Sequence, residues 1–214
     1  MNYLDILLDF IFPASCTICG KSGTDICLAC LSHCPSAERE CSQWIFPLFD
    51  YRYPPVKQAV HLLKYRGKKR LAKVFAEALH GKISEELADL SIMENFRDAL
   101  LIPIPLAPGR RRERGFNQAE LICRHLTTLD PNLKTESKVL IKPKDTEHQA
   151  RIRDRTLRLK NIIGSFSVQN PERIKKRNII LIDDVVTTGA TLSEARQLLR
   201  KAGARKIIAF SVAH

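Results

Sequence analysis

The stretch at 178–195, NIILIDDVVTTGATLSEA, places the tightest constraint on the fold. Its apolar run from Ile179 to Ile182 is typical of a central strand in a parallel sheet, because such a strand is buried on both faces. Two carboxylates, Asp183 and Asp184, end the run, and a turn then leads into a helical pattern from Thr191. This order predicts an α/β fold with a ligand site at the carboxyl end of the strand.

The turn itself predicts a phosphate site. It comprises Thr187, Thr188, Gly189, Ala190 and Thr191. The glycine lets the backbone turn tightly, and the first amides of a helix attract a phosphate together with the positive end of the helix dipole. The two carboxylates would repel a phosphate, so we expect them to bind sugar hydroxyls, directly or through Mg²⁺. An ordinary strand-to-helix turn with N-capping threonines is the alternative interpretation.

The remaining chain repeats the alternation of strands and helices. Apolar runs predict further strands at 98–105, 138–142, 162–168 and 206–213. Helical spacing predicts helices at 56–66, 71–87, 117–129 and 191–203, the last two opening with capping boxes, Asn117 with Glu120 and Thr191 with Glu194. This alternation predicts a parallel sheet flanked by helices, joined by right-handed crossovers.

Three parts are expected along the chain. An N-terminal helix and a cysteine module occupy 1–45, a helical connector packed on the body occupies 46–97, and the α/β domain occupies 98–214. Within the second part, the Pro-containing stretch 46–55 is expected to be a linking segment. The opening MNYLDILLDFIF lacks the basic start of a signal peptide and is too short to cross a bilayer. We therefore expect a cytoplasmic protein without a membrane span.

The charge is concentrated in the body of the chain. The formal net charge is +12, and residues 1–50 hold two cationic and six acidic side chains, which leaves +16 for the rest. Such a body suits a phosphorylated small molecule, a nucleic acid or both, although a merely solvated basic surface is the simpler alternative. Four arginines follow the first predicted strand of the domain and could grip a diphosphate bidentately or form a solvated basic loop: Arg110, Arg111, Arg112 and Arg114.

A long polar segment, 142–161, separates two of the predicted strands. A segment of this length within a compact domain is usually functional or disordered. The functional interpretation is a flap that closes over the bound ligand and excludes water.

The cysteine module predicts a metal site. Cys16 and Cys19 form one CxxC pair, Cys27 and Cys30 form another, and seven residues separate the pairs. Four thiolates suit a tetrahedral structural Zn²⁺ that can fold a module lacking its own core. A cytoplasmic setting disfavours disulfides, a redox CxxC is a further alternative, and Cys34 could replace Cys30 as the fourth ligand.

These motifs resemble those of known proteins. The stretch 179–191 resembles the signature of type I phosphoribosyltransferases. The ordered set of the cysteine module, LKYRG at 63–67, IPIPL with RGFNQ at 114–118 and the phosphate turn resembles the ComF family. This resemblance implies phosphoribosyl pyrophosphate as donor with Mg²⁺, catalytic Asp183 and Asp184 on the ribose hydroxyls, and the turn on the 5′-phosphate. It also implies donor contacts from Arg110, Arg111, Arg114, Gln149 and Arg158.

The ComF resemblance further implies a role in natural transformation, with imported single-stranded DNA and other competence proteins as partners. Two hypotheses follow. In the first, the protein is an enzyme that transfers phosphoribose to a nucleophile and releases pyrophosphate. In the second, it is a non-catalytic factor that binds single-stranded DNA and whose donor site is regulatory. The basic segments 64–70 and 110–114 would then form the DNA groove, with stacking from Tyr65 or Phe116.

Overall fold

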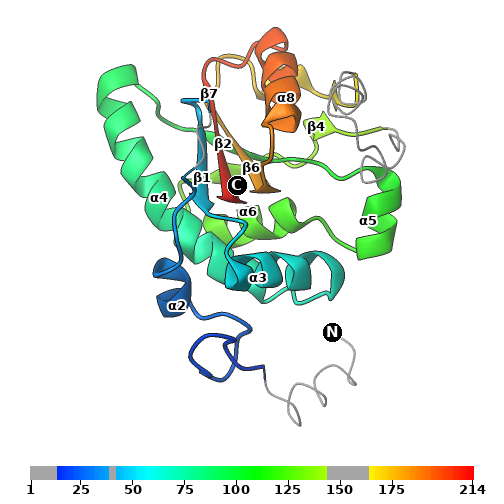
Figure 1. Ribbon diagram of the computed structural model, residues 1–214. Helices are drawn as coiled ribbons and strands as arrows, with labels where there is room; N and C mark the ends of the chain where they lie inside the picture. Colours follow the sequence, from blue (N-terminus) through cyan, green and yellow to red (C-terminus); the bar gives the residue numbers. More distant parts are fainter. Residues whose placement is uncertain (1–13, 39–41, 144–163) are drawn as a thin grey trace.

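The computed structural model describes residues 14–38, 42–143 and 164–214 (Figure 1). The amphipathic helix expected at the amino terminus lies outside these ranges, as does nearly all of the expected flap with Gln149 and Arg158. Within the described ranges, no helix combines the length and the apolar character that crossing a membrane requires.

A five-stranded parallel sheet forms the centre of the molecule, as the sequence predicts. Its order is β1-β7-β6-β2-β3. The strands are β1 (Ile45–Phe49), β2 (Leu100–Pro103), β3 (Lys134–Thr135), β6 (Ile179–Val185) and β7 (Ile207–Ala213). β6 pairs with β2 on one side and with β7 on the other, so the predicted central strand is central.

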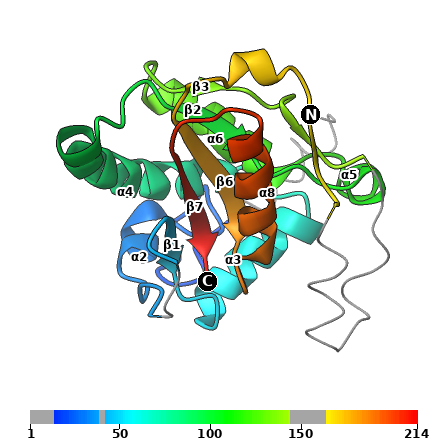
Figure 2. The same cartoon turned by 90° about the horizontal axis from the view of Figure 1, so that it is seen from above.

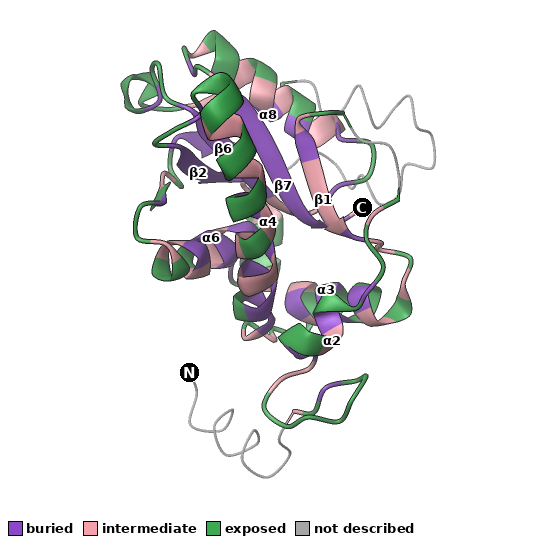
Figure 3. Cartoon of the chain, turned by 90° about the vertical axis from the view of Figure 1, so that its left-hand side faces the viewer, coloured by how far each residue is buried: buried purple, intermediate pink, exposed green. Residues whose placement is uncertain are grey.

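Helices cover both faces of this sheet (Figures 1 and 2). α8 (Ala190–Lys201) lies on one face, and α3 (Pro54–Tyr65), α4 (Leu71–Glu94) and α6 (Gln118–Leu129) lie on the other. Successive side chains of a strand point to opposite faces. Ile179 and Leu181 of β6 therefore join the core under α8, whereas Ile180 and Ile182 join the core under α4 and α6. The neighbouring strands β6 and β7 are accordingly buried along most of their length (Figure 3).

The sheet extends beyond the range that the sequence suggests for it. β1 lies in the stretch expected to be a linking segment, and it pairs with β7 from Ile45 to Phe49. It is an edge strand, where a proline such as Pro47 costs no hydrogen bond that the sheet needs. The expectation of a simple linker was wrong because the proline obscured the strand pattern.

Two other predicted strands pair outside the main sheet. β4 (Leu140–Ile141) and β5 (Ser167–Val168) form a separate antiparallel pair. Three short helices have no counterpart among the predicted elements, namely α2 (Leu28–Ser32), α5 (Pro108–Arg114) and the 3₁₀ helix η1 (Pro171–Arg173). The arginine-rich segment is thus helical rather than an open loop.

The two predicted capping boxes differ in outcome. Asn117 caps α6 by accepting a hydrogen bond from the Ala119 amide, as predicted, but Glu120 pairs with Arg111 instead of closing the box. α8 begins one residue earlier than expected, with Gly189 as its N-cap and no side-chain cap. Its Glu194 accepts hydrogen bonds from the amide and hydroxyl of Ser165, so this box was wrong.

Candidate functional site

The carboxylate pair ends the central strand at its carboxyl end. Asp183 and Asp184 lie within β6, and Asp183 is in register with Ser211 of β7. The chain then turns into α8 at Gly189, whose φ of +72° is a conformation that favours glycine. A Cβ added there would also lie 3.2 Å from Cδ1 of Ile45. The turn therefore favours glycine at this position, and a larger residue would also have to displace the Ile45 side chain by a few tenths of an ångström.

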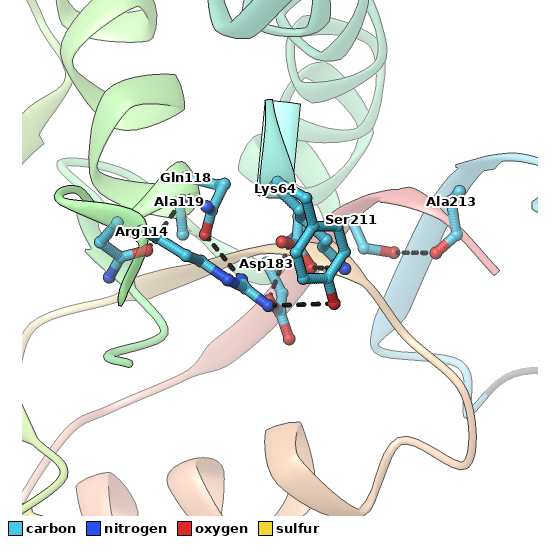
Figure 4. Close-up of polar contacts among 10 residues, drawn as sticks. Lys64, Arg114, Gln118, Ala119, Asp183, Ser211 and Ala213 are labelled. Atoms are coloured by element: carbon cyan, nitrogen blue, oxygen red, sulfur yellow. Dashed lines mark hydrogen bonds and ion pairs between the residues drawn. The ribbon is translucent and has the colours of Figure 1, made fainter. Parts of the chain in front are cut away.

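A pocket of about 490 Å³ opens beside these carboxylates. Five residues singled out from the sequence line it together, namely Asp183, Asp184, Thr191, Arg110 and Arg114. They come from β6, α8 and α5, which are far apart in sequence. Figure 4 shows Asp183, Arg114 and Lys64 converging on one region from three different elements.

Other predicted site residues lie elsewhere. The guanidinium of Arg111 pairs with Glu120 through contacts of 2.7 and 3.0 Å, and Arg111 does not line the pocket. Thr187 and Thr188 are exposed in the turn, where the Thr188 hydroxyl accepts a long hydrogen bond of 3.4 Å from the Ala190 amide. The turn thus presents hydroxyls to solvent at the amino end of α8.

Lys64 is a site residue that the sequence did not assign to this pocket. Its Nζ lies 2.9 Å from Oδ1 of Asp184, and both side chains are largely shielded from solvent, with exposures of 16% and 12%. Lys142, Asn117, Gln118 and Phe166 also line the pocket. The motifs LKYRG and RGFNQ hold three of these five residues, but only the folded chain shows that α3 and α6 reach the end of β6.

The two carboxylates have different electrostatic surroundings. Burial, and then the neighbouring Asp184, raise the pKa of Asp183 to about 7, although Lys64 and Lys142 oppose the shift. The Asp184 amide also donates a hydrogen bond of 2.8 Å to Oδ1 of Asp183. A carboxyl group that titrates near neutrality and faces a pocket is a common feature of functional sites.

Two residues that line the pocket each hold a buried hydrogen-bond donor without an acceptor within the described part of the chain, Nε of Arg114 and Nε2 of Gln118. Buried polar groups are nearly always paired, so unpaired donors on residues that line a pocket fit a ligand that brings acceptor oxygens. The Arg114 guanidinium is otherwise held in place. Its Nη1 donates a hydrogen bond of 3.1 Å to Oε1 of Gln118, and its Cζ lies 5.0 Å from the centroid of the Tyr65 ring.

The contact between Arg114 and Tyr65 joins the two basic segments. Tyr65 is 55% exposed, whereas Phe116 is 9% exposed and belongs to the core. Of the two aromatic residues considered for base stacking, only Tyr65 is accessible. Arg70 is committed elsewhere, because its guanidinium pairs with Asp25 of the cysteine module at 2.8 Å.

The four predicted cysteines form a cluster. The Sγ atoms of Cys16, Cys19, Cys27 and Cys30 all lie within 4.8 Å of one another, and those of Cys19 and Cys27 are 3.7 Å apart. Sulfurs bound tetrahedrally at ~2.3 Å from a zinc ion would be about 3.8 Å apart, so the donor set fits such a metal. Cys34 lies outside the cluster and donates from its thiol to the Cys30 carbonyl at 3.4 Å.

Protonation in this cluster is uneven. Burial raises the pKa of the Cys16 thiol, but hydrogen bonds from the backbone of Cys19, Ile18 and Cys27 outweigh it and lower the pKa to about 6. The Cys19 and Cys27 side chains raise the pKa of Cys30 through hydrogen bonds. The backbone of the module is thus arranged to favour a thiolate at Cys16, the form that binds metals.

Comparison with known proteins adds a family context. Residues 129–214 match the model of the phosphoribosyl transferase domain. The chain is 30% identical to competence protein ComFC of Bacillus subtilis over 188 residues, which cover 81% of this chain and 70% of that protein. It is 28% identical over 196 residues to the DNA utilization protein YhgH of Escherichia coli K12, covering 90% and 80% of the two chains. A solved hypoxanthine phosphoribosyltransferase of Trypanosoma cruzi superposes with a TM-score of 0.43 at 10% identity, covering 67% and 64% of the chains.

Proposed function

The chain belongs to the ComF family of competence proteins, and we propose that it binds phosphoribosyl pyrophosphate in the pocket at the carboxyl end of β6. One observation carries the proposal. A carboxylate pair and two arginines line the same pocket, and one of those arginines, Arg114, holds a buried donor that has no acceptor within the described residues. A sugar diphosphate brings both hydroxyl donors and phosphate acceptors.

The proposed roles follow from charge. Asp183 and Asp184 accept hydrogen bonds from the ribose hydroxyls, and their oxygens are also suitable ligands for Mg²⁺. When bound, Mg²⁺ would neutralise charge that develops on the departing pyrophosphate. Arg110 and Arg114 hold the pyrophosphate through charge-assisted hydrogen bonds. The turn at 187–191 receives the 5′-phosphate at the amino end of α8.

Further contacts are proposed for the segment between β4 and β5. Gln149 and Arg158 lie outside the described residues, and their donor contacts stay predictions. β4 and β5 flank this segment, and Lys142 and Phe166 at its two ends line the pocket. These anchor positions support a flap over the pocket.

We propose transfer of phosphoribose to a nitrogen or other nucleophile as the reaction. The chain contributes by positioning the donor and by stabilising pyrophosphate as it leaves C1, which are the main sources of catalysis in such a displacement. In the context of competence and DNA use, the second candidate is a factor that binds single-stranded DNA and uses the donor as a regulator. The exposed Tyr65 beside Arg114 favours it.

We propose Zn²⁺ as the ion held by Cys16, Cys19, Cys27 and Cys30. The spacing of their Sγ atoms and the four-sulfur donor set support zinc in a structural, fully protein-ligated site. We also propose a division of the chain into the module at 1–45, the helical segment at 46–97 and the domain at 98–214, with the parts packed together, because β1 pairs with β7 of the sheet.

The donor site is tested by calorimetry with phosphoribosyl pyrophosphate and Mg²⁺. We expect binding by the unmodified protein and at least a tenfold loss in Asp183→Asn/Asp184→Asn, because both acceptors of the ribose hydroxyls are weakened. Asp89→Asn, an exposed carboxylate on α4, is the matched control and should bind normally. Equal binding by the double variant would refute the proposal. Release of pyrophosphate with a panel of bases, nucleotides and DNA then separates transfer from binding alone.

A further inference from the structure

A second pocket of about 620 Å³ lies at the opposite end of the sheet. It is formed where the chain enters β2, β3, β6 and β7. The pocket beside Asp183 and Asp184, called the donor pocket below, lies instead where β2 and β6 end. Asn178 precedes β6 and Asp183 lies near its end, so the two pockets are separated by about 16 Å along the strand. The residues that line it are Asn95, Arg97, Asp98, Ala99, Pro131, Asn132, Lys134, Lys176, Arg177, Asn178 and Arg205.

This amino-end pocket is more cationic than the donor pocket. Five cationic side chains line it against one carboxylate, that of Asp98. The donor pocket has four cationic side chains against three carboxylates. Such an excess of one charge at a concave surface attracts ligands of the opposite sign.

One of the five cations in the amino-end pocket is held by the backbone, since Nη2 of Arg177 donates a hydrogen bond of 3.0 Å to the Asp98 carbonyl. All five are exposed, and none of them forms an ion pair within the described ranges. Nearby cations behave differently, since Lys206 pairs with Glu94 at 2.6 Å and Arg173 pairs with Glu136 at 2.9 Å. The Asp98 carboxylate, the one acidic group among the described lining residues, forms none of the ion pairs found in the described ranges.

The loops that carry these cations are held in a fixed frame. Asn178 is 4% exposed, and its Nδ2 donates to the Arg97 carbonyl at 2.9 Å. The Arg205 amide donates to the Arg177 carbonyl at 2.8 Å. Asp98 and Lys176 have φ values of +49° and +61°, conformations that cost energy in residues other than glycine.

The cations follow the order of the strands. Lys134 begins β3, Arg97 precedes β2, Lys176 and Arg177 precede β6, and Arg205 precedes β7. These four strands are neighbours in the sheet. With ~4.8 Å between adjacent strands, the row of cations extends for about 14 Å. Successive phosphates of one strand lie farther apart than the ~3.4 Å axial rise of a duplex, so the row can contact a few consecutive phosphates.

We propose that the amino-end pocket binds the phosphodiester backbone of a single nucleic-acid strand. The lining holds no aromatic side chain, so the contacts are to phosphates and carry little sequence preference. This surface differs from the one that the basic segments 64–70 and 110–114 suggest, and it does not depend on donor binding. A strand held here would leave the donor pocket open.

The test is fluorescence anisotropy of a labelled 20-nucleotide oligothymidylate with the full chain over a salt series. We expect Arg97→Gln/Lys176→Gln/Arg205→Gln to weaken binding at least tenfold at low salt. The slope of log K against log salt should fall by about two, at ~0.7 per lost phosphate contact. The matched control, Lys21→Gln/Lys57→Gln/Arg124→Gln, removes the same charge from exposed positions elsewhere and should keep the slope.

Three outcomes would overturn the proposal. They are oligonucleotide binding that the first triple variant retains, no binding even at low salt, and binding of inorganic triphosphate without binding of the oligonucleotide. Calorimetry with phosphoribosyl pyrophosphate on the same triple variant keeps the two proposals apart. Its donor binding should equal that of the unmodified protein, whichever way the DNA experiment falls.

Discussion

Asp183 and Asp184 are adjacent in sequence, yet their surroundings differ. Lys64 lies 2.9 Å from Asp184, whereas burial and the charge of Asp184 raise the pKa of Asp183 to about 7. In the unfolded chain the Asp183 carboxyl would titrate near its ordinary value of about 3.9. The folded protein therefore binds more protons than the unfolded chain between these two values, and ionisation of Asp183 opposes folding as pH rises through this window.

The substitution Asp183→Asn removes this opposition. We expect the variant to be more stable than the unmodified protein at pH 8, by up to about 4 kcal/mol, since the pKa shift is about three units and each unit corresponds to ~1.4 kcal/mol. Near pH 4 the carboxyl is protonated in the folded state, and the difference should shrink. Urea unfolding at pH 4.5 and pH 8 measures both values. A variant that is less stable at pH 8 would contradict this account of the site.

At the scale of an element, α5 assigns different tasks to its arginines. Arg110 and Arg114 are four residues apart, so they lie on the same face of the helix, and both line the donor pocket. Arg111 points to Glu120 instead. The sequence does not distinguish these arginines. They differ only because the helical structure of α5 directs Arg110 and Arg114 to the pocket and Arg111 to Glu120.

Single substitutions in α5 should therefore differ in their effect on donor affinity. Charge-assisted hydrogen bonds contribute about 1.5–3 kcal/mol, so Arg110→Ala and Arg114→Ala should each weaken binding of phosphoribosyl pyrophosphate by roughly 10- to 100-fold. Arg111→Ala loses only an exposed ion pair of about 0–1 kcal/mol and should bind within threefold of the unmodified protein. Calorimetry on the three variants decides it, and a loss for Arg111→Ala as large as for Arg114→Ala would refute the assignment.

The elements that sequence predicted best are those with a strong local pattern. The apolar run of β6 and the acids that end it needed no tertiary information, because burial on both faces dictates four successive apolar residues. β1 and β3 are short edge strands whose pairing is set by their neighbours, so their own patterns are weak. Lys64 was missed as a partner of Asp184 because α3 reaches the end of β6 only in the folded chain.

At the scale of the whole molecule, the cysteine module and the α/β body share one core. Ile26 and Leu31 of the module are fully buried and belong to the cluster that includes Phe75 of α4 and Phe210 of β7. The ion pair between Asp25 and Arg70 joins the same two parts. The four-cysteine cluster lies beside this contact, since Cys27 is the N-cap of α2 and Cys16 belongs to the same core. If the cluster holds the proposed zinc ion, its loss should destabilise the body as well as the module.

We expect Cys16→Ser/Cys19→Ser to lose the proposed zinc ion and to melt at a lower temperature. Structural zinc contributes folding free energy, and in a chain of this size each 1 kcal/mol corresponds to roughly 2–4 °C in melting temperature. If the variant loses a few kcal/mol of stability, its melting temperature should fall by roughly 5–10 °C. Elemental analysis and calorimetric melting give the two readings on the same samples. Cys34→Ser is the matched control, because its thiol donates to a backbone carbonyl outside the cluster, and it should retain the metal. Full zinc content in the double variant would exclude these ligands, and an unchanged melting temperature would show that the module does not stabilise the body.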